Sequence, residues 1–365
     1  GFILNCEACI GVTIDGSNKW RGAPAGKTYG IKLTVTGGGA PSAFLRVGGL
    51  FRFVTVRNVE IDGSWPSIGK YGSGLRMNDL AVKRNQHPGL WHEGLLIEDN
   101  YIHNVGQEGM YIGANYTDSD LPLRNVEIRR NRIEDTGWDG INTKMMWSGD
   151  NSVHHNVVRR AGRNTATTKD RSQYSGIMNQ SGTVQIYNNW VESTGMHGIR
   201  SWTQGGPLIG EKKGPFAAQI WNNVIVDAGG LWRSFMQDSY GISVGAQSGR
   251  EKPVPSIYSN TIVNSRLSAI NVTSDAASGF VRDNIVAGTR SNPAIKVPTF
   301  VNLVNNRVGT VEQLQFMDPN KLDFRLKTGS PARNQGTSTY PDDDFDDIAR
   351  PKGGSADQGA FEASN

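Results

Sequence analysis

The sequence has few of the residues on which zinc-binding and redox proteins depend. Its two cysteines, Cys6 and Cys9, form one C-x-x-C pair, and a structural zinc site would need a second pair or suitably spaced histidines. Glycine and β-branched residues follow the pair, where a redox motif would open a helix. The pair therefore indicates a local disulfide or two buried thiols.

Long apolar runs and long basic runs are also missing. No stretch approaches the roughly 18 apolar residues of a membrane-spanning helix, so we expect no membrane span. The densest basic cluster, at Arg129, Arg130 and Arg132, fits a solvated strand face, and we expect no nucleic-acid partner. Neither an initiator methionine nor a signal peptide precedes the strand-like Phe2-Ile3-Leu4, which predicts a trimmed chain from an extracellular, secreted protein.

Glycine is abundant, with 45 of 365 residues, and asparagine is frequent as well. Both are poor helix formers, so the composition argues against a helical protein. It favours many short strands joined by many turns.

A repeat explains the asparagines. Alternating β-branched residues precede an asparagine every 24 to 37 residues, at Asn100, Asn131, Asn156, Asn189, Asn223, Asn260 and Asn284. Asparagine tolerates the left-handed conformation, and stacked asparagine side chains can hydrogen-bond one another. We therefore expect each asparagine to form a tight corner, with glycine supplying further corners of positive φ.

A second repeat lies between the asparagines. In it a glycine, or in one copy an alanine, precedes alternating residues, at 108–112, 139–144, 175–179, 197–201, 240–244 and 268–272. Strands this short cannot bury a face alone, but coils stacked about 4.8 Å apart form long parallel sheets around one core. The repeats therefore predict an all-β solenoid.

These repeats resemble those of the right-handed parallel β-helix, or pectate-lyase-like, superfamily from about Gly11 to Val304. The segments 322–326, 329–332 and 357–362 resemble the tail that closes many secreted bacterial β-helix proteins. We therefore expect a β-helix over 1–304 and a C-terminal capping tail over 305–365. The resemblance implies a groove along one sheet that binds a polysaccharide.

The glycine segments locate that groove, because residues at equal places stack on one outward face. This face predicts Glu108, Asp139, Lys144, His197 and Arg200 as catalytic residues. We expect substrate-binding residues at Asn142, Tyr111, Gln180, Trp202, Tyr240 and Trp147. Aromatics on the long loops either stack on sugars or pack the loops, and these are Trp65, Tyr71, Trp91, Tyr116, Trp147, Tyr174, Trp202 and Trp232.

Two local resemblances bear on metal binding. The segment 139–144, followed by Gly149 and Asn151, is similar to a stretch of family 9 pectate lyases whose aspartate binds calcium. That family's next block of calcium-binding aspartates corresponds here to 158–162, which has none. The segment 106–113, with Glu108, is similar to the metal-binding coil of family 6 polysaccharide lyases. Both imply Ca²⁺ as a possible cofactor, at Glu108 and Asp139.

The leading hypothesis is a polysaccharide lyase that cleaves a uronate-containing glycan by β-elimination. Lys144 or His197 would be the base, Arg200 and Asn142 would bind the uronate, and Glu108 and Asp139 would bind calcium or orient the base. One alternative is a glycoside hydrolase using Glu108 and Asp139. Another is a non-catalytic adhesin or tailspike-like glycan-binding module. We expect a monomer.

Overall fold

A computed structural model describes residues 2–7, 9–17, 29–35, 41–64, 72–77, 89–113, 121–164, 173–204, 216–231, 238–337 and 341–363, with only the backbone for 2–7. The Cys6 side chain and the loop aromatics Trp65, Tyr71, Tyr116 and Trp232 lie outside the described residues. Cys9 is buried and disulfide-bonded, as one of the two sequence alternatives predicts.

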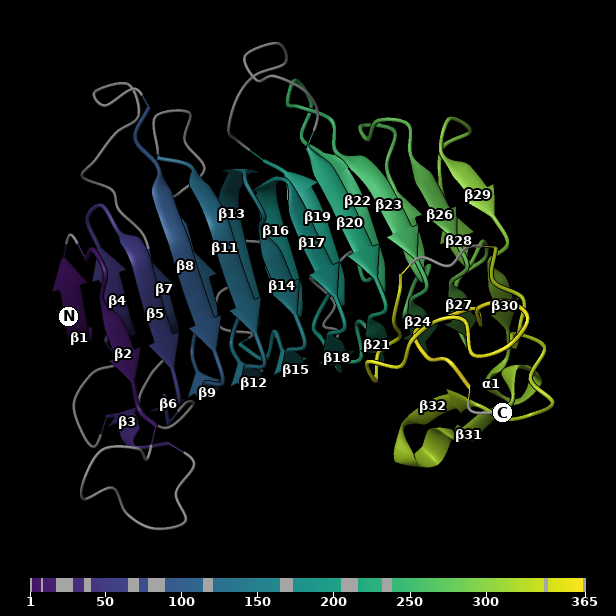
Figure 1. The fold of residues 1–365 in the computed structure, drawn as a ribbon, viewed down its shortest axis with the longest axis horizontal. Coiled ribbons are helices and arrows are strands. Elements are labelled where there is room, and N and C mark those ends of the chain that lie inside the picture. The colour runs from purple at the N-terminus through teal and green to yellow at the C-terminus, as the bar shows by residue number, and fades with distance from the viewer. Residues whose placement is uncertain are drawn as a thin grey trace.

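Successive coils each contribute one strand to three parallel sheets (Figure 1). The first sheet contains β1 (Phe2–Glu7), β4 (Ala43–Gly48), β7 (Ser73–Met77), β10 (Met110–Ile112), β13 (Ile141–Ser148), β16 (Ile177–Gly182), β19 (Ile199–Thr203), β22 (Ile242–Ala246), β25 (Ile270–Val272) and β28 (Ile295–Lys296). The second contains β2 (Thr13–Asp15), β5 (Arg52–Arg57), β8 (His92–Glu98), β11 (Leu123–Arg129), β14 (Ser152–His154), β17 (Val184–Tyr187), β20 (Ala217–Trp221), β23 (Val254–Tyr258), β26 (Phe280–Arg282) and β29 (Asn302–Val304).

The third sheet contains β3 (Ile31–Thr34), β6 (Val59–Asp62), β9 (Tyr101–Val105), β12 (Arg132–Thr136), β15 (Val157–Ala161), β18 (Trp190–Glu192), β21 (Val224–Val226), β24 (Thr261–Val263), β27 (Ile285–Ala287) and β30 (Arg307–Gly309). A short pairing between β11 and β13 joins the first two sheets at one edge. This arrangement confirms the predicted all-β parallel β-helix.

Alternation along each strand builds the core. In the first sheet one inward row runs through paired residues on successive coils, Leu45, Leu75, Met110, Ile141, Ile177, Ile199, Ile242 and Ile270, and all are almost completely buried. Burying one such side chain contributes about 1.5–3 kcal/mol. Because every second residue points inward, the residues between them form the outer face.

The asparagine repeat forms a continuous ladder between the second and third sheets. Each side-chain amide donates to the side-chain oxygen of the asparagine in the next coil, from Asn100 to Asn306, with N···O distances of 2.8 to 3.0 Å. The predicted stacking is confirmed, and Asn306 extends it. The left-handed conformation, however, belongs to the residue before each asparagine, such as Arg130 before Asn131.

The glycines that precede the first-sheet strands are needed for close approach and not for a left-handed corner. A Cβ on Gly140 would lie 2.6 Å from the carbonyl oxygen of Gly176 in the next coil and 2.4 Å from Val158 Cγ1. A Cβ on Gly109 would likewise lie 2.6 Å from the carbonyl oxygen of Gly140. Glycine at this place lets successive coils stack directly.

The C-terminal segment packs on the side of the solenoid. It contains α1 (Val311–Leu314), β31 (Phe316–Asp318), the 3-10 helix η1 (Pro319–Lys321) and β32 (Asp323–Leu326), and its apolar residues cover the outer faces of β21, β24 and β27 (Figure 1). The last coil continues to Gly309, past the expected boundary at 304. At that end the inward-row residues Leu303 and Val308 remain 49% and 53% exposed. None of the helices in the described ranges is long and apolar enough to cross a bilayer.

Candidate functional site

The outer face of the first sheet holds two rows of polar side chains. The first row, which we call the outer row, pairs Arg76, Tyr111, Asn142, Met178, Arg200, Ser243, Asn271 and Lys296 on successive coils. A second row pairs Lys144, Gln180, Trp202 and Gly245. The glycine alignment therefore predicted the register of this face.

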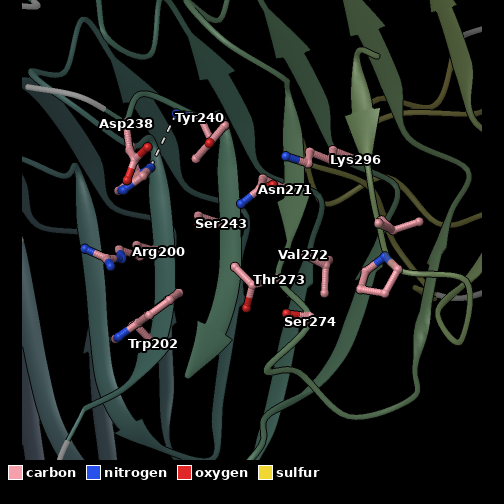
Figure 2. A pocket seen from close by; sticks show the side chains of 13 residues that line it. Arg200, Trp202, Asp238, Tyr240, Ser243, Asn271, Val272, Thr273, Ser274 and Lys296 are labelled. Atoms are coloured by element: carbon pink, nitrogen blue, oxygen red, sulfur yellow. Dashed lines mark hydrogen bonds between the residues drawn. The ribbon is translucent and has the colours of Figure 1, made fainter. Parts of the chain in front are cut away.

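A cavity of about 500 Å³ lies over the last coils of this face (Figure 2). Its walls come from β19, β22, β25 and β28 and the segments beside them. The lining residues are His197, Arg200, Trp202, Asp238, Tyr240, Ser243, Asn271, Val272, Thr273, Ser274, Lys296, Val297 and Pro298. Four predicted site residues, His197, Arg200, Trp202 and Tyr240, thus meet in one cavity.

Aromatic and cationic groups lie in direct contact in this cavity. The Arg200 guanidinium carbon lies 4.6 Å from the ring centroid of Trp202, and both residues come from β19 (Figure 2). The rings of His197 and Tyr240 stack at 5.5 Å. Burial and the nearby Asp238 carboxylate raise the pKa of the Tyr240 phenol, which therefore stays protonated.

The buried His197 is held as a neutral ring. Its Nδ1 accepts the backbone N–H of Tyr240 at 3.3 Å, so the ring proton is on Nε2. Burial, reinforced by the Arg200 charge, lowers the pKa of this imidazole well below its usual range. With Nδ1 engaged and Nε2 protonated, His197 can donate a hydrogen bond but is poorly suited to be the base.

A second cluster lies upstream on the same face and is closed to solvent. Lys144 Nζ donates to the Tyr111 hydroxyl at 2.9 Å and lies 4.2 Å from the ring centroid. Glu108 accepts the Ser73 hydroxyl at 3.0 Å, and among the cations Lys144 most strongly opposes the rise in its pKa. Burial nevertheless raises the pKa of Glu108, which favours the protonated acid.

The Asp139 carboxylate accepts hydrogen bonds from neighbouring groups in the same region. One of its carboxylate oxygens accepts the Asn142 amide at 2.8 Å, and the other accepts the backbone N–H of Ser175 at 2.7 Å. The side-chain oxygens of Asn142 and Gln180 are buried and have no hydrogen-bond partner within the described residues. A sugar hydroxyl or an ordered water would satisfy both acceptors.

The expected calcium ligands do not fit a calcium site. Glu108 favours the protonated acid and lies beside the Lys144 cation, while both Asp139 oxygens face N–H donors. Calcium requires several converging anionic or carbonyl oxygens. Of the described residues, only Glu60, Asp62 and His103 form a group with metal-ligand spacing.

That group lies on the outer face of the third sheet, on β6 and β9. Lys32 Nζ already bonds both carboxylates there, at 2.7 Å to Glu60 and 3.4 Å to Asp62. The group is therefore an ion-pair network on a different face from the cavity.

Several loop aromatics take the packing alternative, and Trp147 does not face the groove as expected. Trp147 is 7% exposed and belongs to the main hydrophobic core, and Tyr174 is fully buried against Met196. Trp91 also packs against the core, whereas Trp202 lines the cavity. The even alternation expected along β13 ends at Met145, which has a positive φ, so Trp147 turns inward.

Sequence reasoning did not select Arg76, Asp238, Asn271 or Lys296 as site residues. Asn271 lies in one of the aligned segments, at 268–272. Arg76 lies within 73–77, which has the same form as the other glycine segments, so the sequence contained a signal for it. Lys296 shares the register of the outer row, but its strand lacks the leading glycine. Asp238 comes from a loop that carries no repeat.

Comparisons with known proteins agree with this architecture. The family described as "Right handed beta helix region" matches residues 54–212. No curated protein matches the sequence. The crystal structure of pectate lyase Pel9A is similar, with a TM-score of 0.54 and 14% identity, over 91% of this chain and 86% of that chain. The chain thus has the right-handed parallel β-helix fold.

Two further solved structures are less similar. A GH136 lacto-N-biosidase from Eubacterium ramulus has a TM-score of 0.39 and 9% identity, over 74% of this chain and 45% of that chain. The mannuronan C-5 epimerase AlgE6 A-module from Azotobacter vinelandii has a TM-score of 0.29 and 14% identity, over 85% of this chain and 91% of that chain.

Proposed function

We propose that this right-handed parallel β-helix protein is a carbohydrate-active enzyme that cleaves an acidic glycan by β-elimination. The glycan lies along the outer face of the first sheet. The carrying observation is the cavity that combines Arg200 and Lys296 with the Trp202 ring. Cations bind sugar carboxylates, and aromatic rings stack on sugar faces. The fold shared with a pectate lyase supports a polysaccharide substrate.

The reaction needs a base next to the sugar carbon that bears the carboxylate. Lys144 shares a row with Trp202, two strand spacings or about 10 Å away, so a glycan that stacks on Trp202 extends toward Lys144. Lys144 is only 3% exposed, so this step requires the face over Lys144 to open and the amine to lose its own proton first. The neutral amine then takes the proton alpha to the carboxylate, the carbon–carbon double bond forms, and the glycosidic oxygen departs with the bonding electrons. Tyr111, bonded to Lys144, is placed to return a proton to that oxygen.

Charge neutralisation is assigned to the protein's own cations. The carboxylate must be neutralised before the proton alpha to it becomes acidic, and Arg200 can do this with a bidentate contact. Asn142 and Gln180 offer acceptors for sugar hydroxyls, and His197 offers the Nε2 proton. Calcium is given no step, because Glu108 and Asp139 do not fit it.

A glycoside hydrolase remains the second candidate, because Glu108 has the raised pKa of a general acid. Its partner would be Asp139 on the adjacent coil, whose oxygens already accept two hydrogen bonds. This pairing is weaker than the lyase assignment, since an Asp139 whose two oxygens already accept N–H donors is poorly placed to act as base or nucleophile.

One experiment separates these functions. The protein is incubated with a panel of uronate polymers, and both ultraviolet absorbance of an unsaturated uronate and new reducing ends are followed. The lyase predicts both signals together. Reducing ends without absorbance favour the hydrolase, and glycan binding with neither signal favours a non-catalytic binding module. Each of those two results would overturn the lyase proposal.

We also propose an extracellular location and a monomeric state. The disulfide at Cys9 suits an oxidising compartment, which supports an extracellular enzyme acting on polysaccharide. The residues assigned to the groove all come from one chain, so a monomer suffices for the reaction.

A further inference from the structure

The two cations of the cavity lie at opposite ends of the part of the outer row that lines it. Arg200 on β19 and Lys296 on β28 are separated by Ser243 and Asn271, which occupy the two intervening coils (Figure 2). Three strand spacings separate the backbones of Arg200 and Lys296 by about 14 Å. The positive charge is thus placed at two points with neutral hydrogen-bonding groups between them.

The neighbouring side chains keep the centre of the cavity free of positive charge. Beside Ser243 and Asn271 lie the neutral His197 ring, the protonated Tyr240 and the hydroxyl of Thr273. Asp238 adds a negative charge near Tyr240. Arg200 and Lys296 are the only Lys or Arg side chains among the described residues that line the cavity. A sugar carboxylate bound at the centre would lack a cation.

This arrangement bears on the spacing of acidic groups in the substrate. A sugar residue in an extended glycan advances by close to one strand spacing, so a glycan across the cavity places neutral positions between the two cations. A polymer with a carboxylate on every sugar, or on every second sugar, would place at least one unpaired charge there, which is costly. A polymer with a carboxylate on every third sugar would match both cations and leave the centre neutral.

We infer that the substrate is a heteroglycan in which two neutral sugars separate successive acidic sugars. This inference rests on the proposed function and names the substrate class of the same cavity. Specificity comes from Asn271 and Ser243, which reject a central charge, as much as from Arg200 and Lys296, which attract the flanking ones.

Calorimetry with the full chain tests the inference directly. The probes are two hexasaccharides of equal length: a synthetic one with uronate only at the first and fourth sugars, called the spaced probe, and one from polygalacturonate, in which every sugar is charged. We expect the spaced probe to bind about tenfold more tightly or better, which corresponds to about 1.4 kcal/mol. Equal or tighter binding of the oligogalacturonate would overturn the inference and leave the lyase proposal standing. Absence of binding to every probe would overturn both.

A gain-of-function variant tests the preference for a neutral centre without relying on a loss of binding. Asn271→Lys places a cation at the centre, so we expect the preference to shift toward oligogalacturonate by about tenfold. Asn271→Gln is the matched neutral control and should leave the preference unchanged. Ser243→Lys makes the same test on the adjacent coil if Asn271→Lys unfolds. An unchanged preference in folded lysine variants would contradict the inference.

Variants that remove Arg200 or Lys296 test whether these two cations bind the acidic sugars. Arg200→Gln and Lys296→Gln should each weaken binding of the spaced probe about tenfold or more and reduce the salt dependence of binding. Lys252→Gln, outside the cavity, is the control. An effect no larger than that of Lys252→Gln would contradict the assignment of the two end cations.

Discussion

The side-chain oxygen of Asn156 accepts two hydrogen bonds from Asn131, one from its side-chain amide and one from its backbone N–H, both at 3.0 Å. The Asn156 amide in turn donates to Asn189 in the next coil and to the carbonyl oxygens of Ile128 and His154. One buried side chain therefore holds three coils at a corner.

Removing that side chain should be costly. Asn156→Ala leaves several buried donors and acceptors unpaired, so we expect a loss of about 3 kcal/mol or more in the free energy of unfolding, measured by chemical denaturation. Asn306→Ala, at the half-exposed last rung, should cost less, and the exposed Asn320→Ala should change little. Similar values for Asn156→Ala and Asn320→Ala would show that the ladder is not a stabilising element.

Lys144 provides the direct test of the proposed base. Lys144→Met keeps much of the apolar stem and removes the amine, so kcat should fall by about 10²- to 10⁴-fold while glycan affinity changes little. Initial rates of unsaturated product and calorimetry measure the two effects, with Lys252→Met as the control. A variant with full turnover would refute the assignment.

His197 should act as a neutral donor and not as the base. His197→Asn places an oxygen where Nδ1 accepts the Tyr240 N–H, so the fold and most of the turnover should survive, whereas His197→Phe should lose this contact. Because burial and Arg200 lower the pKa of His197, nuclear magnetic resonance should show no protonation of this ring near its ordinary pKa. A normal titration there, or loss of all turnover in His197→Asn, would favour His197 as the base.

His154 should make the fold sensitive to acid. Burial is the largest cause of its shift and the Glu127 carboxylate opposes it, so the pKa falls from 6.5 to about 4. A lowered histidine pKa stabilises the fold fully above 6.5, and that contribution disappears as the pH falls from 6.5 to about 4. We expect a loss of up to about 3 kcal/mol over this window.

The variant His154→Phe isolates that effect. It keeps a ring that can stack on Tyr187, which lies 4.5 Å from His154 between centroids, and it cannot titrate. Denaturation midpoints measured across the window should therefore fall less steeply in the variant than in the natural protein. Parallel slopes would mean that other groups cause the acid sensitivity.

Much of the fold could be predicted because each coil repeats the same pattern of asparagine, glycine and alternating apolar residues. The ladder asparagines and the glycines at Gly109 and Gly140 mark equivalent places, and equivalent places fix the register of the outer row. The sequence could not show why glycine is needed at Gly109 and Gly140, because the close approach to the carbonyl oxygen of the next coil is a tertiary contact.

The site was only partly predictable for a related reason. Register alone placed Arg200 and Trp202 correctly, but it could not show that Lys144 and Glu108 are closed to solvent or that Trp147 turns inward after Met145. Which nitrogen of His197 is engaged depends on the neighbouring backbone of Tyr240. Asp238 reaches the cavity from a non-repeating loop, where no pattern locates it.

The exposed Leu303 and Val308 have a consequence for how the molecule acquired its length. Among the described residues, the C-terminal segment covers the side of the solenoid and leaves the inward rows of the last coil partly exposed. Each coil outside the covered side makes its main contacts with its two neighbours, so duplication of such a coil would preserve the existing contacts between coils. The number of coils is therefore open to change by gene duplication, and with it the number of sugar units that one groove spans.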